Sequence, residues 1–470
     1  MKITLIGLGV SEGDLTLKAK NALDGAGVII ARTQHCEGFK SLNGYTVRTL
    51  DDIYPGCRNF DTLNKKLATE VLKAAKLGDV CYCVDGSVCE DEGCKIILSK
   101  HKDCIIIDGI SKLAHIASLA NLKKSGVCGI SAYAIDELKS CRAAAVYDID
   151  CDYIAGRVKE RLSDIFGEER PCVFVRGNEV KRIKLYELDR QKNYDLSCGL
   201  AVEEDEFLKK DRYDFADLEE LITILRAPGG CPWDRAQTSE SIKSNMIEEA
   251  YELVDAIERG DTDGMEEETG DVLLQAAFHS VMHRELGEFT GSDALTRVVK
   301  KLIFRHSHIF GNDKAGDGAE ALGVWEKNKQ KEKGQSTFGE SVAAVPANFP
   351  ACMRAQKVQK RAAKSGMDFI SAISASESLA DEVTELLNAL TDGNGDVFEE
   401  AGDVLFSAVN VCRHAGVDCE EALRASIKKF SERFIECEKQ IIADGKNITE
   451  LNELELNVYW ERAKNALKAN

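Results

Sequence analysis

Pairs of acidic residues recur at helical spacing in the second half of this 470-residue chain. Glu249 and Glu252 stand three positions apart, as do Glu268 and Asp271. Residues three apart share one face of a helix, so two facing helices can direct all four carboxylates at one point. Such like charges repel one another, and Mg²⁺, which takes oxygen ligands and bridges phosphates, relieves the repulsion. The spacing therefore predicts a magnesium site that can bridge the phosphates of a substrate.

The acidic pattern appears a second time further along the chain, which indicates an internal repeat. The second set of acids consists of Glu382, Glu385, Glu400 and Asp403. Each set is followed by two cations four positions apart, and then by a tryptophan with a lysine four positions after it. These followers are Lys301, Arg305, Trp325 and Lys329 in the first copy, and Lys429, Arg433, Trp460 and Lys464 in the second.

Each of these groups also has a purely structural interpretation. A single acidic cluster is commonly a solvated helix face, but two clusters with matching cations favour a site. The cations are expected to hold substrate phosphates and the leaving pyrophosphate, the alternative being surface ion pairs. Trp325 and Trp460 either stack on a base or pack the helices, and packing is favoured. His279 and Asn410, about two turns beyond the acids, are either site contacts or helix-surface groups.

The elements that position these residues change in character along the chain. Residues 1–205 alternate short apolar strands with helical stretches, which is typical of an α/β domain, and 182–188 is one of the expected strands. Helical periodicity then dominates. It predicts two all-α segments at 215–330 and 340–470, separated by a polar break at 331–339.

Composition excludes several classes of protein. A net charge of -19 argues against a nucleic-acid partner, and the lack of a run of about 18 apolar residues argues against a membrane span. The start of the chain lacks a signal-peptide pattern, so a cytoplasmic location is expected, with the 17 cysteines reduced. The spacing of Cys81, Cys83, Cys89 and Cys94 fits no standard zinc pattern.

The motif string at 225–238, Leu-Arg-Ala-Pro-Gly-Gly-Cys-Pro-Trp-Asp-Arg-Ala-Gln-Thr, followed by the first acids, resembles the MazG family of nucleoside triphosphate pyrophosphohydrolases. The second copy resembles the C-terminal repeat of that family. The resemblance implies that all eight acids are metal ligands and that a glutamate serves as the catalytic base, the candidates being Glu249, Glu268, Glu382 and Glu400. Asp381 departs from the pattern, which favours glutamate at that position, and leaves the more active repeat unassigned.

The same resemblance implies an all-α fold, obligate homodimers, and Mg²⁺-dependent conversion of a nucleoside triphosphate to the monophosphate and pyrophosphate. A metal-activated water would attack the α-phosphorus. A regulatory protein that senses nucleotides without turnover is the alternative from a different class.

A glycine turn follows the first expected strand of the N-terminal half. Its Gly-x-Gly-x-x-x-Gly spacing is not the dinucleotide fingerprint, but with later segments it resembles the tetrapyrrole (corrin/porphyrin) methylase family. That resemblance implies S-adenosylmethionine as cofactor, bound by Gly7, Leu8, Gly9, Asp14, Asp85, Gly86 and Ser111. Both cofactor loops depart from the family pattern by lacking their usual proline. An active methyltransferase and a retained scaffold therefore both remain open for this half.

Overall fold

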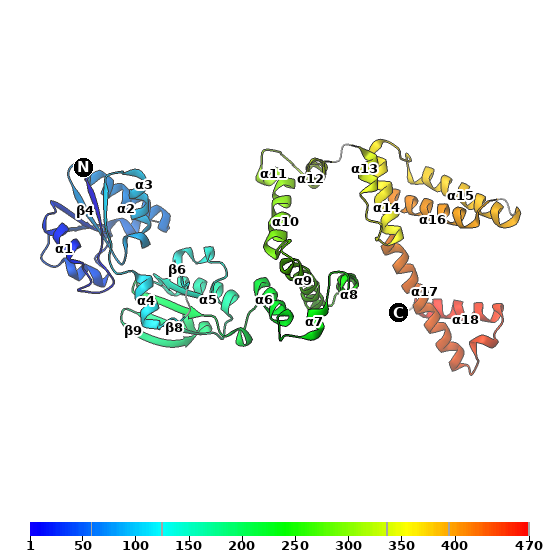
Figure 1. The fold of residues 1–470 in the computed structure, drawn as a ribbon, viewed down its shortest axis with the longest axis horizontal. Helices are drawn as coiled ribbons and strands as arrows, with labels where there is room; N and C mark the ends of the chain where they lie inside the picture. Colours follow the sequence, from blue (N-terminus) through cyan, green and yellow to red (C-terminus); the bar gives the residue numbers. More distant parts are fainter. Residues whose placement is uncertain (58, 124–125, 335–336, 393–394, 469–470) are drawn as a thin grey trace. The chain divides into compact units, whose positions relative to one another are not determined.

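The computed structural model describes residues 1–470 apart from 58, 124–125, 335–336, 393–394 and 469–470. It divides into two compact units, Met1–Gly291 and Ser292–Asn470, which are described separately below (Figure 1). Part of the expected polar break, 335–336, lies outside the described residues.

The first unit begins with a five-stranded parallel sheet in the order β3-β2-β4-β1-β5. Its strands are β1 (Ile3–Gly7), β2 (Val28–Ala31), β3 (Val47–Thr49), β4 (Val80–Val84) and β5 (Cys104–Ile107). Its helices are α1 (Leu17–Asp24), α2 (Phe60–Ala74) and α3 (Glu92–Lys100). One face of the sheet packs on α2 and α3 and the other on α1. Burial on both faces explains why β4 is apolar throughout.

A second five-stranded sheet follows in the order β6-β7-β10-β8-β9, parallel only between β6 and β7. Its strands are β6 (Cys128–Ser131), β7 (Ala143–Tyr147), β8 (Pro171–Arg176), β9 (Glu179–Lys184) and β10 (Cys198–Glu203), with helices α4 (Lys112–Ala120) and α5 (Asp152–Phe166). The strand expected at 182–188 is wrong in its second half, because β9 ends at Lys184 and a 3₁₀ segment follows. Leu185 and Leu188, three positions apart, are both fully buried, which matches the three residues per turn of a 3₁₀ helix.

Every described element after β10 is a helix, as the periodicity predicts. The first group is α6 (Phe215–Arg226), α7 (Pro232–Ala236), α8 (Lys243–Arg259), α9 (Thr262–Glu285), α10 (Gly291–Arg305), α11 (Ser307–Phe310) and α12 (Gly318–Lys333). The second group is α13 (Phe338–Ala343), α14 (Ala351–Ala362), α15 (Ala372–Asp392), α16 (Val397–His414), α17 (Cys419–Ala443) and α18 (Glu453–Ala466). Short 3₁₀ segments occur between some of these helices.

Two helical hairpins hold the acidic residues, α8–α9 in the first unit and α15–α16 in the second (Figure 1). Gly260 ends α8 in the left-handed conformation at φ 66°, and Asp261 then caps α9 by accepting a hydrogen bond from the Gly264 amide. Asp396 caps α16 in the same way. The first hairpin packs on α6 and the second on α14. The recurrence of hairpin plus packing helix supports the internal repeat.

Burial along the two hairpins differs. Ala277 and Phe278, which follow the acids of α9, are buried in a core with α6. Leu405 and Phe406, which follow Asp403, are 69% and 45% exposed. Apolar residues beyond the acids are therefore buried in the first hairpin, while the acids themselves stay half-buried or exposed. In this single chain the corresponding apolar residues of the second hairpin are exposed.

Candidate active site

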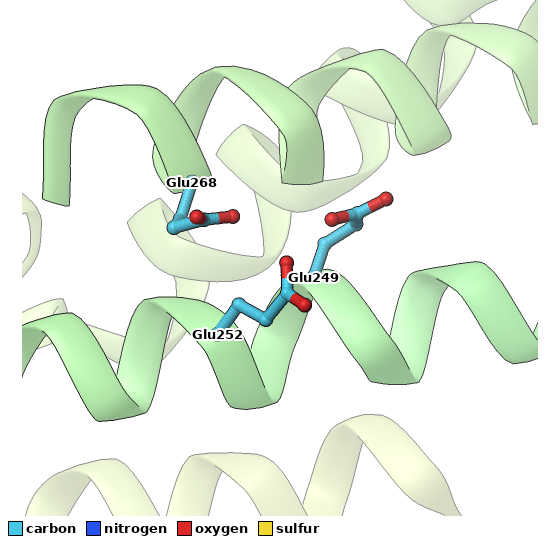
Figure 2. Close-up of side chains that lie close together, drawn as sticks. All are labelled: Glu249, Glu252 and Glu268. Atoms are coloured by element: carbon cyan, nitrogen blue, oxygen red, sulfur yellow. The ribbon is translucent and has the colours of Figure 1, made fainter. Parts of the chain in front are cut away.

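The first hairpin brings together three of its four predicted acids. One carboxylate oxygen from each of Glu249, Glu252 and Glu268 lies within 4.8 Å of the other two. Figure 2 shows Glu249 and Glu252 extending from one helix toward Glu268 on the facing helix. Asp271, one turn beyond Glu268, is not part of this close group. Helical spacing on two facing helices therefore brings three of the four acids together.

Burial and the crowding of the carboxylates raise the pKa of two of them. Burial, and then the charge of Asp271, raises the pKa of Glu249, while a hydrogen bond donated by Gln275 Nε2 to Glu249 Oε1 at 3.3 Å opposes the rise. Burial and the charge of Glu252 raise the pKa of Glu268. Burial and neighbouring negative charge both disfavour the ionised form of these carboxyl groups.

The second hairpin forms a matching group from Glu382, Glu400 and Asp403, whose carboxylate oxygens also lie within 4.8 Å of one another. Burial raises the pKa of Glu382 and of Glu400, with added repulsion from Asp403 and Glu385 respectively as the next cause. Glu385 itself lies outside the close group. The two hairpins thus share two equivalent glutamates but differ in their third member.

Gln275 is a polar residue near the first cluster that the acidic motif alone does not identify. It is 6% exposed and lies one turn beyond Asp271 on α9. Its position, four residues after the last acid and within an otherwise apolar stretch, is the sequence signal that would have indicated it. The corresponding residue of the second hairpin is Ser407, so the buried amide is specific to the first cluster.

The cations that follow the first acids lie on α10 in the second unit. Arg305 is buried, its Nε lies 2.7 Å from a carboxylate oxygen of Glu332, and its guanidinium lies 5.0 Å from the ring centre of Trp325. The Lys329 ammonium lies 4.6 Å from the same ring. Lys301 is half-buried. Within this unit Trp325 therefore contacts cations of its own chain.

The cations that follow the second acids lie on α17. Lys429 is exposed and Arg433 is half-buried, and neither forms an ion pair within the described part of the chain. Trp460 on α18 packs on Phe430, with ring centres 5.3 Å apart, which agrees with the packing interpretation. Lys464 pairs with Glu461 at 3.0 Å. The assignment of Lys429 and Arg433 to substrate phosphates stays a prediction.

His279 and Asn410 both contact neighbouring side chains rather than the acids. His279 Nδ1 lies 3.0 Å from Ser239 Oγ, and burial together with His283 lowers its pKa. Asn410 Oδ1 accepts hydrogen bonds from Arg413 at 3.0 Å and 2.7 Å. The expectation that they are site contacts remains a prediction.

Asp368 is held by Arg413 and His414 at the end of α16. Asp368 Oδ2 accepts a hydrogen bond from Arg413 Nη1 at 3.1 Å, and His414 Nε2 lies 2.9 Å from Oδ1. The hydrogen bond from Arg413 is the main cause that lowers the pKa of Asp368 to about 2. The ion pair fastens the segment before α15 to the second hairpin.

Asp368→Asn is expected to lower the free energy of unfolding of the second hairpin by about 1 kcal/mol at pH 7, a value reduced for solvent screening. Because the folded-state pKa is depressed, this stabilisation is present above the unfolded pKa of about 3.9 and is lost as pH falls toward about 2. Urea unfolding at pH 7 and at pH 3 tests this. Equal stability of the variant and the wild type at pH 7 would contradict it.

Six of the seven residues predicted to bind a cofactor are absent from the lining of the neighbouring cavity. A cavity of about 270 Å³ lies beside them, and Asp85 is the only one of the seven in its lining. Gly9 and Gly86 bond to each other, Asp14 accepts bonds from the amides of its own turn, and Ser111 caps α4. In this conformation the residues present do not fit S-adenosylmethionine.

Two other expectations concern metals and membranes. Among the described residues, the two acidic clusters are the groups whose ligand atoms lie close enough to share an ion, and the cysteines at 81, 83, 89 and 94 form no such group. No described helix combines the length and the apolar character that a membrane span requires.

Comparison with known proteins agrees with the arrangement of the helical half. The family profile described as "MazG nucleotide pyrophosphohydrolase domain" matches residues 237–310 and 371–437, which contain the two hairpins and their following cations. The nucleoside triphosphate pyrophosphohydrolase/pyrophosphatase MazG of Thermotoga maritima is 42% identical over 52% of this chain and 95% of its own length. The nucleoside triphosphate pyrophosphohydrolase of Escherichia coli is 36% identical over 53% of this chain and 97% of its own length.

A relative also spans both halves. The uncharacterized protein YabN of Bacillus subtilis is 30% identical over 98% of this chain and 98% of its own length. Among solved structures, the uroporphyrin-III-C-methyltransferase from Thermus thermophilus matches 43% of this chain and 94% of its own, at 15% identity and a TM-score of 0.35.

Proposed function

Because this chain belongs to the MazG nucleotide pyrophosphohydrolase family, we propose that its helical half hydrolyses nucleoside triphosphates to monophosphates and pyrophosphate. The observation that carries the proposal is the convergence of three carboxylates on each of two hairpins. A solvated acidic face would spread its charges apart, whereas these two sets gather them.

The acids fit Mg²⁺ by the chemistry of their donor atoms. Each cluster offers oxygen ligands alone, which a hard cation prefers. Burial, and then repulsion between the acids, raises the pKa values of Glu249, Glu268, Glu382 and Glu400, and a cation would relieve that repulsion. Bound Mg²⁺ would supply positive charge to the phosphates and make water more acidic. Asp271 and Glu385 are the remaining proposed ligands.

The reaction assigns separate tasks to the residues of the chain. A glutamate of the cluster, Glu268 or its counterpart Glu400, accepts the proton of the water that attacks the α-phosphorus. The bond between the α-phosphorus and its bridging oxygen then breaks, and pyrophosphate leaves. Lys429 and Arg433 hold the outer phosphates and balance the charge on the leaving group.

Homodimers are part of the proposal, and the surface of α17 supports them. Leu423, Ile427, Phe430 and Phe434 are all exposed in the single chain. Their spacing of four, three and four residues forms one apolar stripe along the helix, as in a coiled-coil seam. An exposed stripe of this kind is typical of a surface that a partner covers, and a second copy of α17 has the matching pattern.

A nucleotide sensor without turnover would use the same acids, so measurement of turnover separates the two functions. Full-length protein with Mg²⁺ and a panel of canonical and modified nucleoside triphosphates is expected to release one pyrophosphate for each monophosphate formed. Chelation of the metal is expected to stop the release. Absence of pyrophosphate with every triphosphate, alongside tight nucleotide binding, would instead establish the sensor.

A further inference from the structure

A buried lysine bridges the two sheets of the N-terminal half. Lys112 Nζ, at the start of α4, donates a hydrogen bond to Asp148 Oδ1 at 2.6 Å and lies 2.9 Å from Asp85 Oδ2. Asp85 directly follows β4 of the first sheet, and Asp148 directly follows β7 of the second. The three side chains are only 12–16% exposed. One ammonium group thus links carboxylates that come from different sheets.

The environment keeps this lysine charged. Burial lowers its pKa, but the charges of Asp148 and Asp85 outweigh burial, and the net effect raises the pKa of Lys112. Asp148 adopts a left-handed backbone conformation, with φ 64°, which is unfavourable for a non-glycine residue and persists only where surrounding contacts hold it. Loss of the ammonium would leave two buried carboxylates unpaired, a strongly destabilising change.

The glycine turn beside this lysine has its amides already bonded within the chain. The Gly9 amide donates to the Gly86 carbonyl, and the Gly86 amide donates back to Gly9. The Val10 and Ser11 amides both donate to the Asp14 carboxylate, at 3.0 Å and 2.8 Å. A ligand that approached this turn would have to displace these bonds rather than meet free donors.

The start of α4 is closed in a similar way. The Lys112 and Leu113 amides donate to the Glu90 carboxylate at 2.9 Å and 3.0 Å, and the Ser111 hydroxyl donates to it at 2.7 Å. The Lys112 stem covers the second glycine loop, since a methyl group added at Gly86 would lie 2.8 Å from Lys112 Cγ. The helix N-terminus and the loop are therefore both occupied by side chains of the protein.

The space that remains is small for a nucleoside-sized cofactor. The cavity of about 270 Å³ includes Lys112 and Asp85 in its lining, and pockets for ligands of that size usually measure about 300–1,000 Å³. S-adenosylmethionine carries a sulfonium cation and an adenosine that need charge and hydrogen-bond partners. Here the two carboxylates between the sheets already have a cation.

We propose that Lys112 is a built-in cation that takes the place of a cationic ligand between the two sheets, so that this half is a locked scaffold which does not bind S-adenosylmethionine. This inference is independent of the proposed hydrolysis. It concerns different residues and is tested by different measurements.

The first test uses the full-length wild-type protein. Titration with S-adenosylmethionine to about 1 mM in a calorimeter is expected to give no binding heat. A ligand with a dissociation constant of about 1 mM would have a binding free energy of about -4 kcal/mol. Saturable binding tighter than this would overturn the proposal. A cooperative thermal unfolding transition of the same sample shows that the protein is folded, so the titration does not depend on the proposed hydrolysis.

The second test restores the cation from solution. Lys112→Ala is expected to lower the melting temperature, and n-propylammonium, which matches the atoms removed, is expected to raise it again relative to NaCl at equal ionic strength. Lys40→Ala is the matched control, because Lys40 lines the same cavity but pairs with Glu37 on the exposed surface. A variant at 112 as stable as wild type, or one that n-propylammonium does not stabilise, contradicts the proposal. Should Lys112→Ala not fold, Lys112→Arg, which keeps the charge, is expected to fold.

Discussion

Glu268→Gln combined with Glu400→Gln is expected to lower the rate of pyrophosphate release by at least about 10²-fold, the lower limit for loss of a general base. The two substitutions remove one carboxylate from each cluster and retain the shape of each side chain. Both glutamates belong to the close groups of acids, so metal binding would weaken together with proton transfer. Steady-state assays with saturating Mg²⁺ measure the effect.

The matched control is Glu267→Gln combined with Glu399→Gln. These glutamates directly precede the first pair, are exposed, and lie outside the close groups, so activity should stay near that of the wild type. Equal losses of activity in the two double variants would show that the overall negative charge of these helices, rather than the clusters, supports the reaction. Undiminished release after the first double substitution would refute the site.

The variant with Glu268→Gln and Glu400→Gln should also be more stable than the wild type when no metal is added. The pKa values of Glu268 and Glu400 are raised in the folded state. Such groups contribute stability below their unfolded pKa, and this contribution is lost as pH rises through the folded pKa. Neutral glutamines avoid that loss at pH 7. A higher melting temperature together with lost activity would show that the substitutions damage the site and leave the fold intact.

Lys429→Ala combined with Arg433→Ala, made in a Glu268→Gln background, is expected to lower kcat/KM by about 10²-fold, as for loss of a preorganised charge partner of the transition state. The background restricts turnover to the second hairpin. Because neither cation forms an ion pair within the described residues, the free energy of unfolding should change little. Kinetic assays and urea unfolding of the same samples report the two quantities.

Lys428→Ala in the same background serves as the control for charge, since Lys428 is an exposed neighbour on α17. It should leave kcat/KM nearly unchanged. If the Glu268→Gln background alone abolishes turnover, the second hairpin does not act independently. Undiminished kcat/KM after loss of both cations would show that the role given to Lys429 and Arg433 is wrong. In the first repeat, by contrast, Arg305→Ala should mainly destabilise the protein, because Arg305 is buried against Glu332 and Trp325.

The local sequence pattern was enough to predict the two types of fold and the grouping of the acids. The two types of fold along the chain follow from apolar periodicity, and three of four acids converge in each hairpin because a spacing of three residues fixes their helix face. The second half of the strand expected at 182–188 is wrong, because side chains three positions apart are buried there in a 3₁₀ helix. Short segments of this kind depend on tertiary packing rather than on their own pattern.

Contacts between distant residues account for what the sequence did not reveal. Asp85 was assigned to a cofactor, yet its carboxylate pairs with Lys112, and only the folded chain brings Asp148 to the same ammonium. Arg305 was assigned to phosphate, and its partner Glu332 lies on another helix. Neither pairing has a fixed spacing along the chain, so no motif could indicate it.

The third member of the acidic cluster differs between the hairpins, with Glu252 in one and Asp403 in the other. Each hairpin has its own helix caps and its own packing helix, so neither needs the other to position its acids. A duplicated unit of this kind tolerates change, because a substitution that harms one copy leaves the other in place. Within one polypeptide, one hairpin can then change its acids while the other keeps its own arrangement.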